Sequence, residues 1–393
     1  MPSIESLGYP LAYKANSDSY PVPSLKFGED EIAVRLEARA LEGMQKEAFV
    51  QYGPNDSVWR MVSDEGPYLN GTDLAPFPLA FYSAGMAFSF LSELERHTAE
   101  GNIKLQSAAI EQENYYTMEG SAIRGDMIGG ALPSELSAYI EADASQEQIV
   151  EVIKLAEASS PAQSYMNDVL LNTFALEANG QTLPVSGVAA STGEPDTDPV
   201  SKFDSAHPAS GLDFMEEIVS KRATAETMNG VEGGAGSSLK SEQKRTLHVH
   251  AEAAIREDGL REAEIQLFKP IGSTFRFLSD EDARVAPPSL GYLSVGVAFC
   301  YMTQLGRYAT ILKQDLSSYR VIQDNVFKIG IGGRKAEAKP VNTQVFVDLD
   351  DTQAAAQRLI YMGERTCFLH AAMRSSNRSE MKAELRGEQL EFA

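Results

Sequence analysis

The chain contains two diverged copies of one segment, and this internal repeat constrains its fold more than any other feature. One gapless match joins SVWRMVSDEG at 57–66 to STFRFLSDED at 273–282, at an offset of 216 residues. A longer match joins APFPLAFYSAGMAFSFLSELER at 75–96 to APPSLGYLSVGVAFCYMTQLGR at 286–307, at an offset of 211. Offsets that drift by a few residues are those expected after a duplication followed by small changes in loop length.

Weaker matches on either side keep the same order. Segment 32–43 aligns with 247–258, and segment 145–161 aligns with 352–368, by hydrophobic pattern more than by identity. With 393 residues, the chain is long enough for two domains, each with its own core. The repeat therefore predicts two related domains in tandem.

We place the first domain at 1–180 and the second at 244–393. The segment between them, 181–243, is rich in Gly, Ser, Pro and acidic residues, which is typical of a mobile linker. Within it, the stretch 211–222 has apolar residues at helical spacing and predicts a short helix.

Each copy is expected to be an α+β unit. In the second copy, two alternating runs around Glu257-Asp258-Gly259 predict a hairpin, and a long apolar run without proline predicts a buried helix. The expected elements are strands at 247–256, 261–268 and 273–279, a helix at 290–312, strands near 318–330 and 341–349, and an amphipathic helix at 351–374.

Charge and composition argue against several classes of partner. The formal net charge of −22 opposes binding to nucleic acid or to anionic membranes, because both are polyanions. The first residues carry no basic and apolar export signal, and no window approaches the roughly 18 apolar residues of a spanning helix. We therefore expect a cytoplasmic protein.

The chain has two cysteines, Cys300 and Cys367, which excludes a disulfide framework. In a reducing compartment such a pair is either inert core or a pair of reactive thiols. Cys300 falls inside the expected buried helix, and Cys367 falls in the second helix. The repeat places Ser89 and Ser160 at the corresponding positions of the first copy, so only the second copy can carry out thiol chemistry.

The second copy has an apolar helix with a stripe of small residues that ends in Ala-Phe-Cys, and a second cysteine about 65 residues later in another helix. In these features it resembles the OsmC/Ohr family of thiol-dependent organic hydroperoxide reductases. The resemblance covers 245–393, and the first copy repeats the plan without cysteines. It implies that Cys300 is the peroxidatic thiol and Cys367 the resolving thiol, with a dithiol or protein reductant as co-substrate, no resident cofactor and a role in the stress response.

The resemblance also explains the duplication. Members of the family are homodimers whose subunits build active sites at their interface. A fused tandem would be a pseudo-dimer within one chain, with antiparallel sheets packed around central apolar helices. The first copy would then act as a structural partner, because serine cannot enter the sulfenic acid cycle.

The sequence departs from the family at the groups that activate the thiol. The family's glutamate, ten residues before the peroxidatic cysteine, is replaced by Leu290, and by Leu79 in the first copy. Arg256, at the end of the first strand, is our candidate for the family's arginine. The repeated Ser-Asp-Glu at 63–65 and 279–281 is interpreted as a turn signal rather than a catalytic acid.

Three histidines of the second copy, His248, His250 and His370, leave three interpretations open. In the first, all three are ordinary surface or helix-end residues. In the second, His370 or one of the strand histidines activates a thiol. In the third, one or two histidines bind a metal ion together with Cys300 and Cys367. The same alternatives hold for the whole chain: a thiol peroxidase that acts on hydroperoxides or a related small electrophile, or a homologue that binds a small hydrophobic ligand or a metal.

Overall fold

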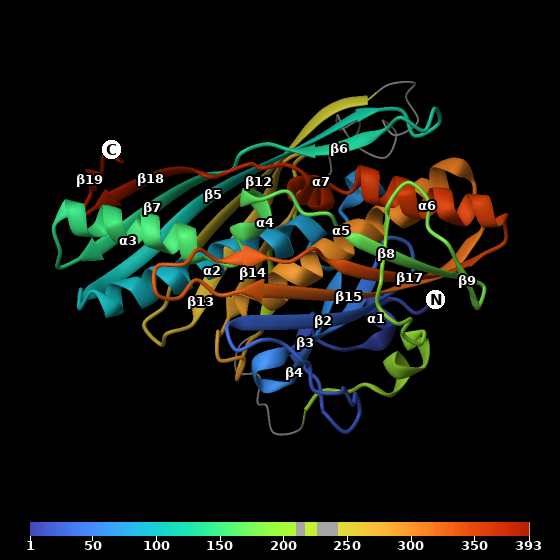
Figure 1. The fold of residues 1–393 in the computed structure, drawn as a ribbon, viewed down its shortest axis with the longest axis horizontal. Coiled ribbons are helices and arrows are strands. Elements are labelled where there is room, and N and C mark those ends of the chain that lie inside the picture. Colours follow the sequence, from blue (N-terminus) through green and yellow to red (C-terminus); the bar gives the residue numbers. More distant parts are fainter. Residues whose placement is uncertain (210–216, 226–242, 393) are drawn as a thin grey trace.

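The protein belongs to the α+β class and is built from two large, mostly antiparallel sheets with helices between them (Figure 1). The computed structural model describes residues 1–209, 217–225 and 243–392. The fold class predicted from the sequence is therefore confirmed.

The first sheet has ten strands, most of them in the order β1-β4-β3-β2-β15-β17-β8-β10. Their bounds are β1 Ala12–Lys14, β4 Ser57–Ser63, β3 Lys46–Tyr52, β2 Glu31–Ala40, β15 Leu316–Lys328, β17 Asn342–Leu349, β8 Thr173–Ala178 and β10 Ala189–Ala190, with β16 (Glu337–Ala338) on β15 and β9 (Gln181–Leu183) on β8.

The second sheet has nine strands, most of them in the order β11-β14-β13-β12-β5-β7-β18-β19. Their bounds are β11 Val219–Ala223, β14 Thr274–Ser279, β13 Arg261–Lys269, β12 Gln243–Ile255, β5 Leu105–Gly120, β7 Glu135–Ala142, β18 Glu380–Leu385 and β19 Glu388–Gln389, with β6 (Ile128–Ala131) on β5.

Both sheets contain strands from both copies of the repeat. In the first sheet, β2 of the first copy pairs with β15 of the second, with Ala38 opposite Val321. In the second sheet, β12 of the second copy pairs with β5 of the first, with Ala251 opposite Gln112. At the far side, β8 and β18 pair in parallel with β17 and β7 of the other copy. The two copies are therefore interleaved.

Two long helices, α2 (Pro78–Glu100) and α5 (Ser289–Leu312), pack against each other in the centre of the molecule (Figure 1). Their closest approach is at glycines that occupy equivalent positions in the two copies. A Cβ atom at Gly85 would lie 2.5 Å from the backbone nitrogen of Leu293, and one at Gly296 would lie 2.7 Å from that of Tyr82. Glycine therefore lets the two backbones meet.

A shorter helix in each copy packs beside the long one. These helices are α3 (Gln146–Ser159) and α6 (Gln353–Thr366), each followed by a further short helix, α4 (Ser164–Asn167) or α7 (Phe368–Arg374). The single helix expected at 351–374 is thus interrupted, because Cys367 has an extended backbone conformation that ends α6 and begins α7. No helix in the described ranges is long and apolar enough to cross a membrane.

The described part of the inter-copy segment packs against the rest of the chain. Within the 3-10 helix η3 (Pro199–Ser205), Phe203 is buried in a small cluster with Tyr20 and Phe49. The segment also supplies β10 to the first sheet. An aromatic anchor and an added strand hold these residues in place, so the mobile linker expected from composition is not what these ranges show.

The helix expected at 211–222 is wrong over its C-terminal part. Residues 219–223 form strand β11, which pairs with β14. Without β11, the edge of β14 would have unpaired backbone N–H and C=O groups. Pairing with these groups stabilises residues 219–223 as a strand more than the weak helical spacing of their apolar residues stabilises a helix. Residues 211–216 of the expected helix lie outside the described residues.

Candidate functional site

The two cysteines lie side by side in the interior. Cys300 is in the middle of α5, and Cys367 is at the junction of α6 and α7. Their Sγ atoms are 3.4 Å apart, both thiols are free, and both residues are buried. The Cys367 thiol donates to the Cys300 sulfur, and it accepts a hydrogen bond from the backbone of His370 at 3.5 Å. A small movement would bring the sulfur atoms to disulfide distance.

The first copy repeats this arrangement with oxygen in place of sulfur. The Oγ atoms of Ser89 and Ser160 are 2.9 Å apart and buried. Ser160 also accepts a hydrogen bond from the backbone of Gln163, the residue that corresponds to His370. The counterparts assigned from the repeat therefore occupy equivalent places in the structure.

A narrow pocket reaches Cys300 but does not include Cys367 among its lining residues. It has room for about one water-sized group beyond its lining atoms. Most of the lining is apolar and comes from both copies. The lining residues are Glu65, Tyr68, Leu69, Phe77, Pro78, Leu79, Leu247, Leu267, Cys300, Thr303, Gln304 and Phe368.

Glu65, from the first copy, supplies the carboxyl group of this pocket. It accepts hydrogen bonds from Thr303 Oγ1 at 2.9 Å and from the Tyr68 hydroxyl at 2.9 Å. Burial raises the pKa of Glu65, and this effect outweighs the opposing influence of Lys46 and of the two hydrogen bonds. A carboxyl group with a raised pKa keeps its proton to higher pH and can donate it.

Lys46, also from the first copy, supplies a buried positive charge. Its side chain is fully buried and donates to the carbonyl of Met44. Burial lowers the pKa of Lys46, and attraction to Glu65, Asp64 and Cys300 opposes that change. Lys46 thus brings a basic side chain of the first copy into electrostatic interaction with Cys300.

The environment of Cys367 differs from that of Cys300. Burial raises the pKa of Cys367 well above its usual range, and the interaction with Cys300 adds to the increase. Cys367 therefore stays a protonated thiol at neutral pH. The thiol that faces the pocket and the thiol buried behind it can have different roles.

Arg256 does not join this site. It forms ion pairs with Asp258 at 2.8 Å and Glu262 at 3.2 Å, next to the turn of the β12–β13 hairpin. Leu247 lines the pocket nine residues earlier, and a strand of that length extends about 30 Å. Arg256, the candidate for the family's arginine, therefore lies at the end of β12 that is remote from the pocket.

His370 lies next to Cys367 through its backbone, but its ring cannot supply a positive charge. The ring is buried and packs against Phe174 and Tyr301, with centroids 5.5 and 5.3 Å away. Burial, assisted by Arg374, lowers the pKa of His370 to about 3. The imidazole is thus neutral at physiological pH, so activation of a thiol by a protonated His370 is not supported.

His248 and His250 face away from the cysteines. Side chains alternate along β12, so these two residues lie on the face opposite Leu247, which lines the pocket. Both donate to Glu113 of β5, at 2.5 and 2.7 Å. The proposed metal set of cysteines and strand histidines is therefore not brought together. Over residues 1–209, 217–225 and 243–392, no three or more His, Cys, Asp or Glu side chains are placed to hold a metal ion.

The His250–Glu113 pair crosses the seam between the two copies, and it predicts a pH-dependent stability. Burial alone would lower the pKa of His250, but hydrogen bonds and charge interactions with Glu113 and Glu252 raise it above its ordinary value of 6.5. When the pKa of a histidine is higher in the folded state than in the unfolded state, its protonation stabilises the fold. This stabilisation is complete at pH values below the pKa of the unfolded state, and it is lost as the pH rises through the pKa of the folded state.

We therefore expect His250→Gln to lower the free energy of unfolding by roughly 1 kcal/mol near pH 5.5 and by much less near pH 8.5. Urea unfolding at both pH values measures this difference. Glu113→Gln should reproduce the pH dependence, and the double variant should show less than the sum of the two single effects. An equal loss at both pH values would contradict the assignment.

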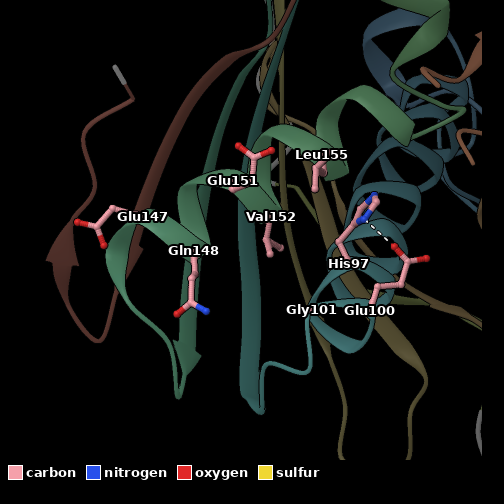
Figure 2. A pocket seen from close by; sticks show the side chains of 8 residues that line it. All are labelled: His97, Glu100, Gly101, Glu147, Gln148, Glu151, Val152 and Leu155. Atoms are coloured by element: carbon pink, nitrogen blue, oxygen red, sulfur yellow. Dashed lines mark ion pairs between the residues drawn. The ribbon is translucent and has the colours of Figure 1, made fainter. Parts of the chain in front are cut away.

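A second pocket lies on the surface between the end of α2 and helix α3, and contains neither cysteine. Figure 2 shows His97 turned towards Glu100, with Nδ1 3.1 Å from the carboxylate, while Glu147 and Glu151 point in different directions. Because the polar groups do not converge, this pocket offers no arrangement for catalysis.

The sequence analysis missed Glu65 and Lys46 as site residues. The repeated Ser-Asp-Glu motif marked the position of Glu65, but it was interpreted as a turn signal. The sequence feature that could have identified Glu65 is the recurrence of this acidic motif in both copies. The sequence could not show that Glu65 lies near Cys300, because the motif of the first copy is close to a cysteine of the second.

Comparison with protein-family models finds no match, and comparison with curated proteins also finds none. Among solved structures, the chain is similar to the crystal structure of an OsmC-like hydroperoxide resistance protein from Jannaschia sp. CCS1. The two are 23% identical over a match that covers 37% of this chain and 96% of that protein, with a TM-score of 0.25.

Proposed function

We propose that the protein is a thiol-dependent hydroperoxide reductase, with Cys300 as nucleophile and Cys367 as resolving thiol. The observation that carries the proposal is the 3.4 Å separation of two free thiols, of which only Cys300 faces a pocket that also holds a buried carboxyl group. Two adjacent thiols are the minimum for a cycle that reduces a peroxide without over-oxidation.

In the first step the Cys300 thiolate attacks one oxygen of the hydroperoxide O–O bond. An S–O bond forms, the O–O bond breaks, and Cys300 becomes a sulfenic acid. The alkoxide that leaves takes a proton from Glu65, whose raised pKa allows it to act as a general acid. The organic product is an alcohol, and the peroxide has gained the two electrons that the sulfur lost.

In the second step the Cys367 sulfur attacks the sulfenic sulfur of Cys300. An S–S bond forms and the S–O bond breaks, and the hydroxide that leaves takes up the Cys367 thiol proton as water. A dithiol then reduces the disulfide by exchange and is itself oxidised to a disulfide. The reductant is a dithiol or a protein thiol, and no metal or organic cofactor enters the cycle.

The duplication has a function in this proposal. Glu65 of the first copy lines the pocket at Cys300, and Lys46 interacts electrostatically with Cys300, so the first copy completes a site that it does not itself possess. The chain would then be a fused pseudo-dimer of two OsmC-like units, over 1–180 and 244–393, with one of two equivalent sites kept for redox work.

Consumption of cumene hydroperoxide with dithiothreitol as reductant tests the proposal. We expect steady turnover with the dithiol and much slower turnover with an equal concentration of thiol groups supplied as a monothiol, since a dithiol releases the mixed disulfide intramolecularly. Absence of peroxide consumption above the rate of free dithiothreitol would reject the function.

Glu65→Gln is expected to slow oxidation of Cys300 by cumene hydroperoxide about 10²-fold, because the amide fills the same space but cannot donate a carboxylic proton. In the wild type, the rate contribution from Glu65 should fall as pH rises through its raised pKa, and this dependence should vanish in the variant. Stopped-flow measurement of thiol loss across pH gives both results.

Glu281→Gln is the matched control. Glu281 is the counterpart of Glu65 and is buried with a raised pKa; it accepts a hydrogen bond from Ser289 of its own copy and interacts with Ser92 of the first copy, which lacks cysteines. Its substitution should leave the oxidation rate within about twofold. Equal effects of the two substitutions would show that Glu65 acts through general stability rather than chemistry.

A further inference from the structure

The two copies differ by a short insertion in one loop. The offset between them is 216 up to residue 66 and 211 from residue 75 onward, so the first copy has five extra residues there (216 − 211 = 5). In the structure the extra length contains the 3-10 helix η2 (Pro67–Leu69) and the turn that follows it. The corresponding loop of the second copy has only residues 283–285 between the matched segments.

The inserted loop is firmly held. The Asp64 carboxylate accepts hydrogen bonds from the Thr72 backbone at 2.9 Å, the Thr72 hydroxyl at 2.6 Å and the Leu74 backbone at 3.1 Å. The Tyr68 ring lies against Gly66, where a Cβ atom would be 2.5 Å from the ring. These contacts fix Tyr68 in one position.

That position makes the inserted loop part of the wall of the pocket that reaches Cys300. Tyr68 and Leu69 line the pocket, and the Tyr68 hydroxyl donates to Glu65 at 2.9 Å. The shorter loop of the second copy places nothing comparable: the side chain of Arg284 is 78% exposed and pairs with Asp282 at the surface, and Val285 is 52% exposed. The insertion thus adds Tyr68 and Leu69 to the lining of the pocket at Cys300, while Arg284 and Val285 of the shorter loop are exposed.

We propose that Tyr68 sets the preference of Cys300 among hydroperoxides, so that compact hydroperoxides with small apolar groups react faster than bulky ones. This inference rests on the proposed function and adds its substrate class. The apolar walls, including Phe77, Leu247 and Phe368, favour an alkyl group over a charged one. The phenol ring is tied to Glu65. A bulky aromatic hydroperoxide still reacts, but more slowly, because it has to displace the ring.

The test compares hydrogen peroxide, tert-butyl hydroperoxide and cumene hydroperoxide as oxidants of Cys300 in wild type, Tyr68→Ala and Tyr68→Phe. In Tyr68→Ala, the rate with cumene hydroperoxide relative to hydrogen peroxide should rise at least about tenfold, because the larger group no longer has to displace the phenol ring. Tyr68→Phe keeps the ring and should keep the wild-type order of preference. An unchanged ratio in Tyr68→Ala would overturn the inference.

A second readout does not depend on peroxide chemistry. In a Cys367→Ser background, Cys300 is alkylated with N-methylmaleimide and with N-pyrenylmaleimide, which share one reaction and differ in size. Tyr68→Ala should accelerate the larger reagent at least about tenfold more than the smaller one. If Tyr68→Ala accelerates the larger maleimide but no hydroperoxide oxidises Cys300, the proposed function is rejected and the size limit is retained. If hydroperoxides oxidise Cys300 but Tyr68→Ala changes neither the peroxide preference nor the maleimide preference, the size limit alone is rejected.

Leu69→Ala widens the same pocket from a neighbouring side chain and serves if Tyr68→Ala does not fold. Its melting temperature and that of Tyr68→Phe are measured alongside. A folded Leu69→Ala should shift both selectivities in the same direction as Tyr68→Ala, and no shift in either would overturn the inference.

Discussion

Replacement of Cys300 by serine is expected to reduce oxidation of the protein by cumene hydroperoxide by roughly 10³-fold or more, because a hydroxyl group is not a nucleophile towards peroxide at neutral pH. Serine occupies the equivalent position, residue 89, in the first copy and is buried there, so the substitution fits the local packing. Thiol titration against time after mixing with the peroxide measures the rate. The remaining Cys367 thiol should persist, since its raised pKa keeps it protonated.

Cys367→Ser is the informative partner of this variant. The first step should survive, so Cys300 should lose its thiol at nearly the wild-type rate and stop as a sulfenic acid, which dimedone traps and mass spectrometry detects. No disulfide should form. If Cys367→Ser were as slow as Cys300→Ser, the assignment of separate nucleophilic and resolving roles would be wrong.

Gly296→Ala is expected to lower the free energy of unfolding by about 1–3 kcal/mol, because the new methyl group would lie 2.7 Å from the backbone of Tyr82, which cannot rotate away. Gly85→Ala should have a similar effect through the backbone of Leu293. Urea or guanidinium unfolding gives both values.

Gly291→Ala, in the same helix, is the control. A Cβ atom there would meet its nearest neighbours at 3.6 Å, an ordinary contact. The higher helix propensity of alanine should therefore leave stability unchanged or raise it by up to about 1 kcal/mol. Equal effects at Gly291 and Gly296 would show that α2 and α5 do not approach as closely as described.

Much of each unit could be predicted from its own sequence. Period-2 alternation gave the hairpin at 247–256 and 261–268, which appears as β12 and β13, and apolar length gave the helix at 290–312, which appears as α5. These patterns report local burial. They do not report which copy supplies the neighbouring strand, so the pairing of β2 with β15 and of β12 with β5 could not be foreseen.

The candidate site was predictable only in part for the same reason. The cysteines and their serine counterparts followed from the repeat, since equivalent positions in a duplicated fold occupy equivalent places. Glu65 shares a pocket with Cys300 across the interface between the copies, Lys46 acts on Cys300 through its charge, and no spacing along the chain encodes either relation. Arg256 lies at the end of its strand as expected, but that end is the hairpin turn, where it pairs with Asp258 and Glu262.

Intact mass and free-thiol titration, before and after one equivalent of cumene hydroperoxide, test the pairing of Cys300 with Cys367 most directly. Reduced, chelator-treated protein is compared with the Cys300→Ser variant. We predict the loss of both thiols and of two hydrogen atoms from the wild type, with release of one equivalent of the alcohol, and no such change in the variant. Two unchanged thiols in the wild type would contradict the account.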